Sequence, residues 1–336
     1  MDRVSKIQTT VVGSYPVPAW LLGRGSDLAL RDAMMVVLKT QELAGLDLIT
    51  DGELNRFDPA HPDTNGMIDY FVSKMSGIQT RLSRSDLERF RSDPQLSYRS
   101  RPAGIVAGPI GEGTLDLRGD FERIRGLTRS PLKFTCTGPH MLAKVLTNWH
   151  FPDQADLAME IAKILREQLT YLDASVVQLD EANISGHPED SEWAAQAINH
   201  VLDGIGVEKG VHICFGNYGG QTVQKGFWRD LLPFLNSLRT DHLILEFARR
   251  GYAELEDLRD LDPRIALGIG VIDIKDNEVE TADTVASRIE QIVTVLGQDR
   301  LKYIHPDCGF WMLTRSVTDR KMRALVEGRD LFEEKQ

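Results

Sequence analysis

Short apolar runs alternate with helical patterns along most of the chain. Eight runs have the length, composition and turn-forming borders of strands, at about 9–12, 48–51, 132–136, 176–180, 207–214, 242–246, 264–270 and 302–305. Apolar residues three and four positions apart predict helices between most of these runs, at about 28–44, 157–172, 189–202, 228–238, 253–258, 285–296 and 319–332. The alternation predicts a parallel sheet, and the count of eight predicts a single α/β barrel of the (β/α)8 TIM type.

One region interrupts this alternation, between about 57 and 130. Pro59, Pro62 and Asn65 are typical of loops, and the alternating charges of 82–90 are typical of an exposed helix. We interpret the region as an insertion after the second strand that lies over the barrel mouth. No linker-like stretch divides the remaining sequence, which predicts one domain over residues 1–336.

Charge and composition narrow the classes of partner. The 39 basic and 50 acidic residues give a formal net charge of −11, which argues against nucleic acid or an anionic membrane as a partner. The sequence has no run of about 18 apolar residues and no signal-peptide pattern at its start. Three cysteines in 336 residues do not make a disulfide framework, so the expected compartment is the cytoplasm.

Metal-ligand side chains stand at the ends of three predicted strands. His212 and Cys214 are two residues apart and therefore point to the same face of a strand. Glu246 closes a later apolar run, and Cys308 follows the last one. One imidazole, two thiolates and one carboxylate form a tetrahedral zinc set. The alternative interpretation makes the histidine and the cysteines half-buried core residues, with the cysteines acting as small hydrophobes.

Other polar residues also follow predicted strands. In a barrel of this type the active-site groups come from the carboxyl ends of the strands, so these residues are expected to share one site. Each has a structural alternative. Asp51 and Asp180 are also suited to capping the next helix, and Glu53 is suited to pairing with Arg56. The candidates of this kind are Ser14, Asp51, Glu53, Asp180, Glu181 and Asp273, while Cys136 and His305 are interpreted as buried packing residues.

Several short motifs occur together in one order and resemble the catalytic, C-terminal half of cobalamin-independent methionine synthase, in a short form. The resemblance runs from about Thr9 to Leu331. The barrel superfamily to which that family belongs also includes uroporphyrinogen decarboxylase. The motifs are Thr-Val-Val-Gly-Ser-Tyr-Pro at 10–16, Asp-Gly-Glu at 51–53, Thr-Gly-Pro at 137–139, Gln-Leu-Asp-Glu at 178–181, His-Ile-Cys at 212–214, Glu246, Gly-Val-Ile-Asp-Ile at 270–274 and Pro-Asp-Cys-Gly at 306–309.

The resemblance implies a zinc-dependent methyltransferase that moves a methyl group to a zinc-bound small thiol, most simply homocysteine to give methionine. Two other interpretations stay open at this point: a metal-free decarboxylase of the uroporphyrinogen type, and a zinc-containing barrel that is a non-catalytic binding protein. By position, the implied zinc ligands are His212, Cys214, Glu246 and Cys308. The implied substrate-binding residues are Ser14, Glu53 and Asp180, and the catalytic candidates are Asp180, Glu53 and Lys275.

Two departures from the family pattern bear on the methyl donor. The family reads Asp-Ile-His where this chain has Asp273-Ile274-Lys275, and Pro where this chain has Ala182. Transfer from methyltetrahydrofolate requires protonation of the departing nitrogen, which a histidine supplies well. A lysine ammonium is a weak acid at neutral pH. The sequence leaves both methylcorrinoid and methyltetrahydrofolate open as donors, and the lysine favours the corrinoid.

Overall fold

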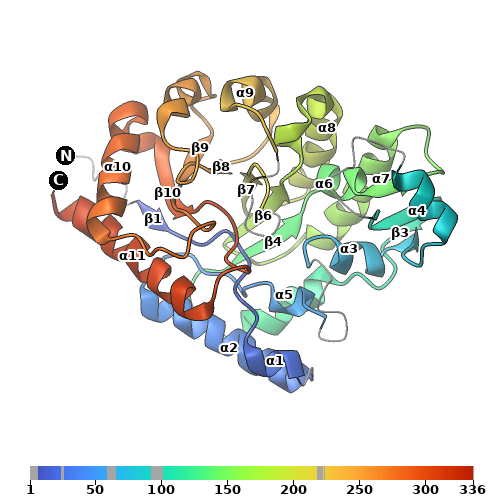
Figure 1. Cartoon of the computed structure of the whole chain (residues 1–336), viewed down its shortest axis with the longest axis horizontal. Coiled ribbons are helices and arrows are strands. Elements are labelled where there is room, and N and C mark those ends of the chain that lie inside the picture. The colour runs from blue at the N-terminus through green and yellow to red at the C-terminus, as the bar shows by residue number, and fades with distance from the viewer. Residues whose placement is uncertain are drawn as a thin grey trace.

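Seven strands form one all-parallel sheet that curls around a central axis (Figure 1). The computed structural model describes residues 7–23, 26–58, 66–91, 101–217, 222 and 224–335. In spatial order the strands are β1 (Gln8–Thr9), β10 (Leu301–Pro306), β9 (Ala266–Ile272), β8 (His242–Leu245), β7 (Glu208–Ile213), β6 (Val176–Glu181) and β4 (Lys133–Thr137).

Two isolated parallel bridges join the edges of this sheet. Thr10 pairs with Leu48, and Ile49 pairs with Leu132. The run at 48–49 therefore lies between β1 and β4 and completes the ring of eight predicted from the sequence. It is too short to count as a full strand because the chain turns sharply just beyond it, with positive φ angles at Gly52 and Glu53. The predicted α/β fold with a curled parallel sheet is confirmed.

Helices surround the strands on the outside of the ring (Figure 1). Side-chain caps begin several of them: Ser26, Asp153 and Thr281 each accept a hydrogen bond from a backbone N–H of the first turn. Within the described residues, no helix is long and apolar enough to cross a membrane. The helices are α1 (Ala19–Gly23), α2 (Asp27–Ala44), α6 (Pro139–Lys144), α7 (Gln154–Leu169), α8 (Ser191–Leu202), α9 (Trp228–Ser237), α10 (Ala282–Leu296) and α11 (Arg315–Glu334), with short 3-10 turns at 54–56, 184–186, 188–190, 253–260 and 298–300.

A second, three-stranded sheet lies outside the barrel ring. In it, β2 (Ser76–Gln79) pairs antiparallel with β3 (Gly104–Gly111), which pairs parallel with β5 (Leu146–Asn148). The helices α3 (Asp69–Lys74), α4 (Arg84–Arg91) and α5 (Leu117–Arg125) belong to the same stretch. The loop residues Pro59, Pro62 and Asn65 lie outside the described residues. One domain with an insertion at about 57–130 stays a prediction.

The interior of the barrel is unusually polar. Lys133, Gln178, His242 and His305 are all buried, and each has at least one polar contact, while Gln178 Oε1 and His305 Nε2 have no hydrogen-bond partner within the described residues. The Gln178 amide donates to the carbonyl of Val12 at 2.9 Å, and His305 donates through Nδ1 to the carbonyl of Pro306 at 2.7 Å. His242 lies 2.9 Å from a carboxylate oxygen of Glu208. Because buried polar groups are costly unless paired, these contacts keep the polar interior compatible with a stable fold.

Candidate active site

A cavity of about 260 Å³ opens at the carboxyl ends of the strands. This is the end of a parallel barrel at which active sites form. Six residues singled out in the sequence line it: Ser14, Glu53, Asp180, His212, Cys214 and Cys308. The structure thus brings together side chains from five different segments of the chain. Glu246 and Lys275 are not among the described residues that line this cavity.

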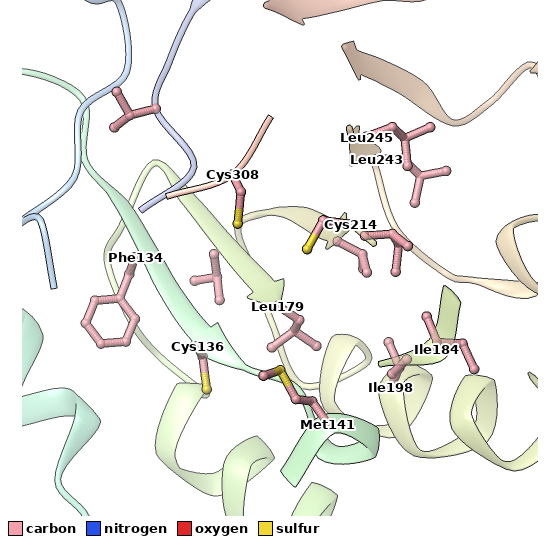
Figure 2. Packing of buried hydrophobic residues seen from close by; sticks show 14 of the residues in the cluster. Phe134, Cys136, Met141, Leu179, Ile184, Ile198, Cys214, Leu243, Leu245 and Cys308 are labelled. Carbon is pink, nitrogen blue, oxygen red and sulfur yellow. The ribbon is translucent and has the colours of Figure 1, made fainter. Parts of the chain in front are cut away.

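Three of these side chains form a compact ligand cluster. A nitrogen of His212 and the sulfurs of Cys214 and Cys308 all lie within 4.8 Å of one another, and all three residues are buried. Figure 2 shows the sulfurs of Cys214 and Cys308 facing each other from the ends of their segments. We call these three residues the metal triad, because one imidazole and two thiols at this spacing are a donor set that zinc favours.

The imidazole of His212 is oriented for coordination. Its Nδ1–H donates to the carbonyl oxygen of Ile244 at 3.0 Å. That bond places the lone pair on Nε2, which is buried and has no partner within the described part of the chain. A buried nitrogen with a free lone pair beside two thiols is an unmet acceptor, and a metal ion satisfies it. The residues present therefore fit a zinc ion.

The two triad thiols differ in their readiness to ionise. A hydrogen bond from Cys214 holds the pKa of Cys308 well below its ordinary value, and the neighbouring His212 lowers it further. The same shared proton, together with burial, raises the pKa of Cys214 well above its ordinary value. One thiolate is therefore favoured before any metal arrives. Metal binding requires the second thiol, that of Cys214, to lose its proton as well.

The third cysteine behaves as a core residue. Cys136 is fully buried and donates to the carbonyl of Thr137 at 3.5 Å. Burial raises the pKa of this thiol. In Figure 2 its sulfur points away from the Cys214 and Cys308 pair. Cys136 thus offers a natural control for the other two.

Glu246 and Lys275 form a buried ion pair beside the triad. Lys275 Nζ lies 2.6 Å from Glu246 Oε1, and the side chains of the two residues are 2% and 0% exposed. The second carboxylate oxygen of Glu246 accepts a hydrogen bond from the backbone N–H of Phe215 at 2.9 Å. The carboxylate lies outside the cluster of three ligand atoms. Its predicted role as a fourth ligand stays a prediction.

A strained turn carries Glu53 into the cavity. Its backbone adopts a φ of 59°, a conformation that residues other than glycine rarely take. The carboxylate of Asp51 holds this turn by accepting the backbone N–H of Glu53 at 2.9 Å. The side chain of Glu53 lies 3.5 Å from Arg56, as the sequence alternative proposed, and accepts a hydrogen bond from Thr135 at 2.6 Å. Glu53 therefore pairs with Arg56 and lines the cavity at the same time.

Buried carboxylates outnumber cations at this end of the cavity. Burial raises the pKa of Asp180 to about 7, partly offset by the nearby His212. Burial also raises the pKa of Asp51 to about 6, against the opposing effect of Arg56. Asp180 is oriented by Gln178, whose amide donates to it at 2.7 Å. Such a group is stabilised when a cation enters, because an opposite charge favours its ionised form.

Ser14 lies against the segment that carries Cys308. The backbone carbonyl of Ser14 accepts the N–H of Phe310 at 2.9 Å. A side chain at Gly309 would come within 2.0 Å of the Ser14 hydroxyl, so the glycine permits this close approach. The Ser14 loop is thereby fixed next to the metal triad.

Several cavity residues were not assigned a role by the sequence. Arg56 was noted as a partner for Glu53, but its burial and its bond to Thr135 Oγ1 at 3.1 Å make it part of the wall. Short-range sequence patterns carry no signal for the others, because the fold brings them in from separate loops. These residues are Tyr15, Phe57, Met141, Asn217 and Gln224.

The chain is similar to known methionine synthases. A family model described as "Cobalamin-independent synthase, Catalytic domain" matches residues 7–329. The chain is 28% identical to a methionine synthase of Saccharolobus islandicus, with 99% of this chain and 97% of that protein covered. It is 29% identical to the methionine synthase of Thermococcus kodakarensis, with 96% and 92% covered.

Solved structures agree with this likeness at the level of the fold. A B12-independent methionine synthase from a Shewanella species, in complex with selenomethionine, superposes with a TM-score of 0.82 at 23% identity, covering 98% of this chain and 99% of that one. A putative vitamin-B12-independent methionine synthase from Listeria monocytogenes gives a TM-score of 0.71 at 20% identity, with 98% of each chain covered.

Proposed function

The chain belongs to the cobalamin-independent synthase catalytic-domain family, and we propose that it is a zinc-dependent enzyme that methylates homocysteine to methionine. The observation that carries the proposal is the metal triad of His212, Cys214 and Cys308 at the wall of a cavity that also holds Glu53 and Asp180. The triad side of this cavity is suited to binding a sulfur through a metal ion, and the side with Glu53 and Asp180 is suited to binding an ammonium group.

The triad is the proposed binding site for zinc. Zinc coordination supplies a thiolate at neutral pH, because it removes the proton of a bound thiol. Two cysteine ligands leave that thiolate electron-rich and nucleophilic. Ile244 keeps the His212 ring in the tautomer that presents Nε2. Glu246, the fourth ligand that the resemblance implies, pairs instead with Lys275 at 2.6 Å in this structure.

The carboxylates of Glu53 and Asp180 are proposed to bind the ammonium group of the amino acid. Both lie in the cavity wall, and with Asp51 behind them they face one buried guanidinium, that of Arg56. The surplus of negative charge attracts a cation. The Ser14 loop, next to the triad segment, is proposed to bind the substrate carboxylate through its donors. The apolar walls around Met141 exclude water from the reacting sulfur.

The two competing interpretations fit the cavity less well. A structural zinc site is closed by its protein ligands, whereas the metal triad here lines an open cavity of about 260 Å³. A metal-free decarboxylase of the uroporphyrinogen type acts on a polycarboxylate. The surplus of carboxylates beside Arg56 repels such a substrate.

The first expected outcome is loss of zinc on removal of either triad thiol. Cys214→Ser and Cys308→Ser should each lose most of the metal, because a hydroxyl replaces a thiolate ligand. Cys136→Ser should keep it, since that cysteine lies in the core. Elemental analysis of protein purified without chelator measures the content. Retention of one zinc per chain in both triad variants would show that the ligand assignment is wrong.

The second expected outcome concerns recognition of the ammonium group. Asp180→Asn and Glu53→Gln should raise KM for homocysteine by roughly 10- to 100-fold, because each loses a charged hydrogen bond. With 4-mercaptobutyrate, which lacks only the amino group, the same variants should change KM little. Asp257→Asn, which removes a carboxylate paired with Arg229 on the outer helices, is the control. Equal losses with both thiols would assign these carboxylates a structural role.

The third expected outcome is a pH dependence specific to the amino-thiol. The raised pKa of Asp180, about 7, means that its charge is lost as the pH falls through neutrality. Between pH 8 and pH 6 its ionised fraction drops about tenfold, so KM for homocysteine should rise by a similar factor. In steady-state kinetics, this rise in KM should be absent with 4-mercaptobutyrate as the acceptor. It should also be absent with homocysteine in the Asp180→Asn variant. The idea fails if the profiles for both acceptors have the same slope.

The fourth expected outcome concerns the methyl donor, which we propose to be a methylated corrinoid. Lys275 Nζ contacts Glu246 Oε1 at 2.6 Å and Thr222 Oγ1 at 3.0 Å, and the residue does not line the described cavity. It is therefore poorly placed to protonate the nitrogen of methyltetrahydrofolate, whereas a corrinoid releases its cobalt without a proton. Methylcobalamin should give the faster turnover of homocysteine when both donors are compared. Faster turnover with the folate, undiminished in Lys275→Ala, would refute the assignment.

A further inference from the structure

The pair formed by Glu246 and Lys275 occupies a place where the family resemblance implies a metal ligand. Both oxygens of the carboxylate are already used: Oε1 by Lys275 at 2.6 Å and Oε2 by the N–H of Phe215 at 2.9 Å. Glu246 is fully buried, and the Lys275 side chain is 2% exposed. Each oxygen thus has a protein partner, and the carboxylate lies outside the cluster formed by the three ligand atoms of the triad.

The lysine is fixed in place by its own loop. The backbone N–H of Lys275 donates to Asp273 Oδ1 at 2.8 Å, and the N–H of Asp273 donates to Glu280 at 2.8 Å. The side chain of Lys321, fully buried, donates to the carbonyl of Asp273 at 2.8 Å. Lys275 Nζ also reaches Thr222 Oγ1 at 3.0 Å. These bonds hold the ammonium group at Glu246.

Coordination of Glu246 by a metal would break this pair. A carboxylate oxygen that moves to the metal leaves a buried ammonium with only Thr222 as a described partner. Breaking a buried ion pair is unfavourable because one charge is then left uncompensated. Lysine and metal therefore compete for the same carboxylate. The family resemblance implies a histidine at the position of Lys275, so the competing ammonium departs from the implied pattern.

We infer that Lys275 is a positioning residue that retains Glu246 as its counterion. The fourth coordination position at His212, Cys214 and Cys308 is thereby left to a ligand from outside, the acceptor thiolate. The inference rests on the proposed zinc site. In this chain the incoming sulfur takes an open position and does not displace a protein carboxylate.

The direct test is a crystal structure of the zinc-loaded protein without thiol, compared with that of Lys275→Met. In the unchanged chain, Glu246 should remain on Lys275 and solvent should be the fourth ligand. In Lys275→Met the freed carboxylate should bind the metal at about 2.0 Å. Glu246 coordinated in the unchanged chain would overturn the inference while leaving the zinc site and the proposed function intact. Absence of stoichiometric zinc would overturn both.

Zinc affinity provides a second test that does not depend on crystals of the variant. Zinc Kd is measured by chelator competition for the unchanged chain, Glu246→Gln, Lys275→Met and the double variant. Glu246→Gln should weaken binding roughly 10- to 100-fold more in the Lys275→Met background than in the unchanged chain. Equal effects in both backgrounds would contradict the inference.

Two further variants separate position from charge. Arg249→Gln removes a cation of the same region that pairs with Asp273 at 3.2 Å and leaves the Lys275 pair in place. In Arg249→Gln, Glu246 should not move to the metal, and the effect of Glu246→Gln on zinc Kd should be the same as in the unchanged chain. Lys275→Gln, which keeps a hydrogen-bond donor without the charge, replaces Lys275→Met in both tests if the methionine variant fails to fold.

Discussion

The register of a closed parallel ring is the constraint on which the whole site depends. Asp180 pairs in register with His212, and His212 pairs with Ile244. Paired residues on neighbouring parallel strands point the same way, so Asp180 and His212 both line the cavity. The carbonyl of Ile244 is then in place to accept the His212 Nδ1–H. A slip of one residue would turn each of these side chains to the other face.

Many of the carboxylates at the strand ends support the structure. Asp307 accepts backbone N–H groups of three consecutive residues after β8, at 2.7–2.9 Å. Glu181 accepts those of His140 and Met141 at the start of α6. Asp51 holds the strained turn at Glu53. Asp307 and Glu181 already accept two or three N–H bonds each and are poor binding groups for a ligand, which is consistent with the proposal that Glu53 and Asp180 bind the substrate.

The sequence predicts those parts of the molecule that local patterns encode. Eight apolar runs were enough to predict the ring, and a two-residue spacing placed His212 and Cys214 on one face. The strand β5 (Leu146–Asn148) escaped detection because three residues carry no periodic signal. The pair of Lys275 and Glu246 was equally invisible, since 29 residues separate them and the resemblance implied a different partner for the carboxylate. Contacts of this kind are decided by side-chain competition in the folded state.

That competition also sets the charge at the two ends of the cavity. At one end, the three buried carboxylates of Asp51, Glu53 and Asp180 lie around the guanidinium of Arg56, which suits the proposed binding of an ammonium group. At the other end, the two triad thiolates would balance the proposed zinc ion, and Lys275 neutralises the carboxylate of Glu246 beside the cavity. A histidine there would leave a third anion close to the position that must accept a thiolate, and it would also offer a proton to the departing donor. The lysine removes both effects together. The proposed ligand set and the proposed methyl donor are therefore linked through one residue, because Lys275 both pairs with Glu246 and stands where the resemblance implies a histidine.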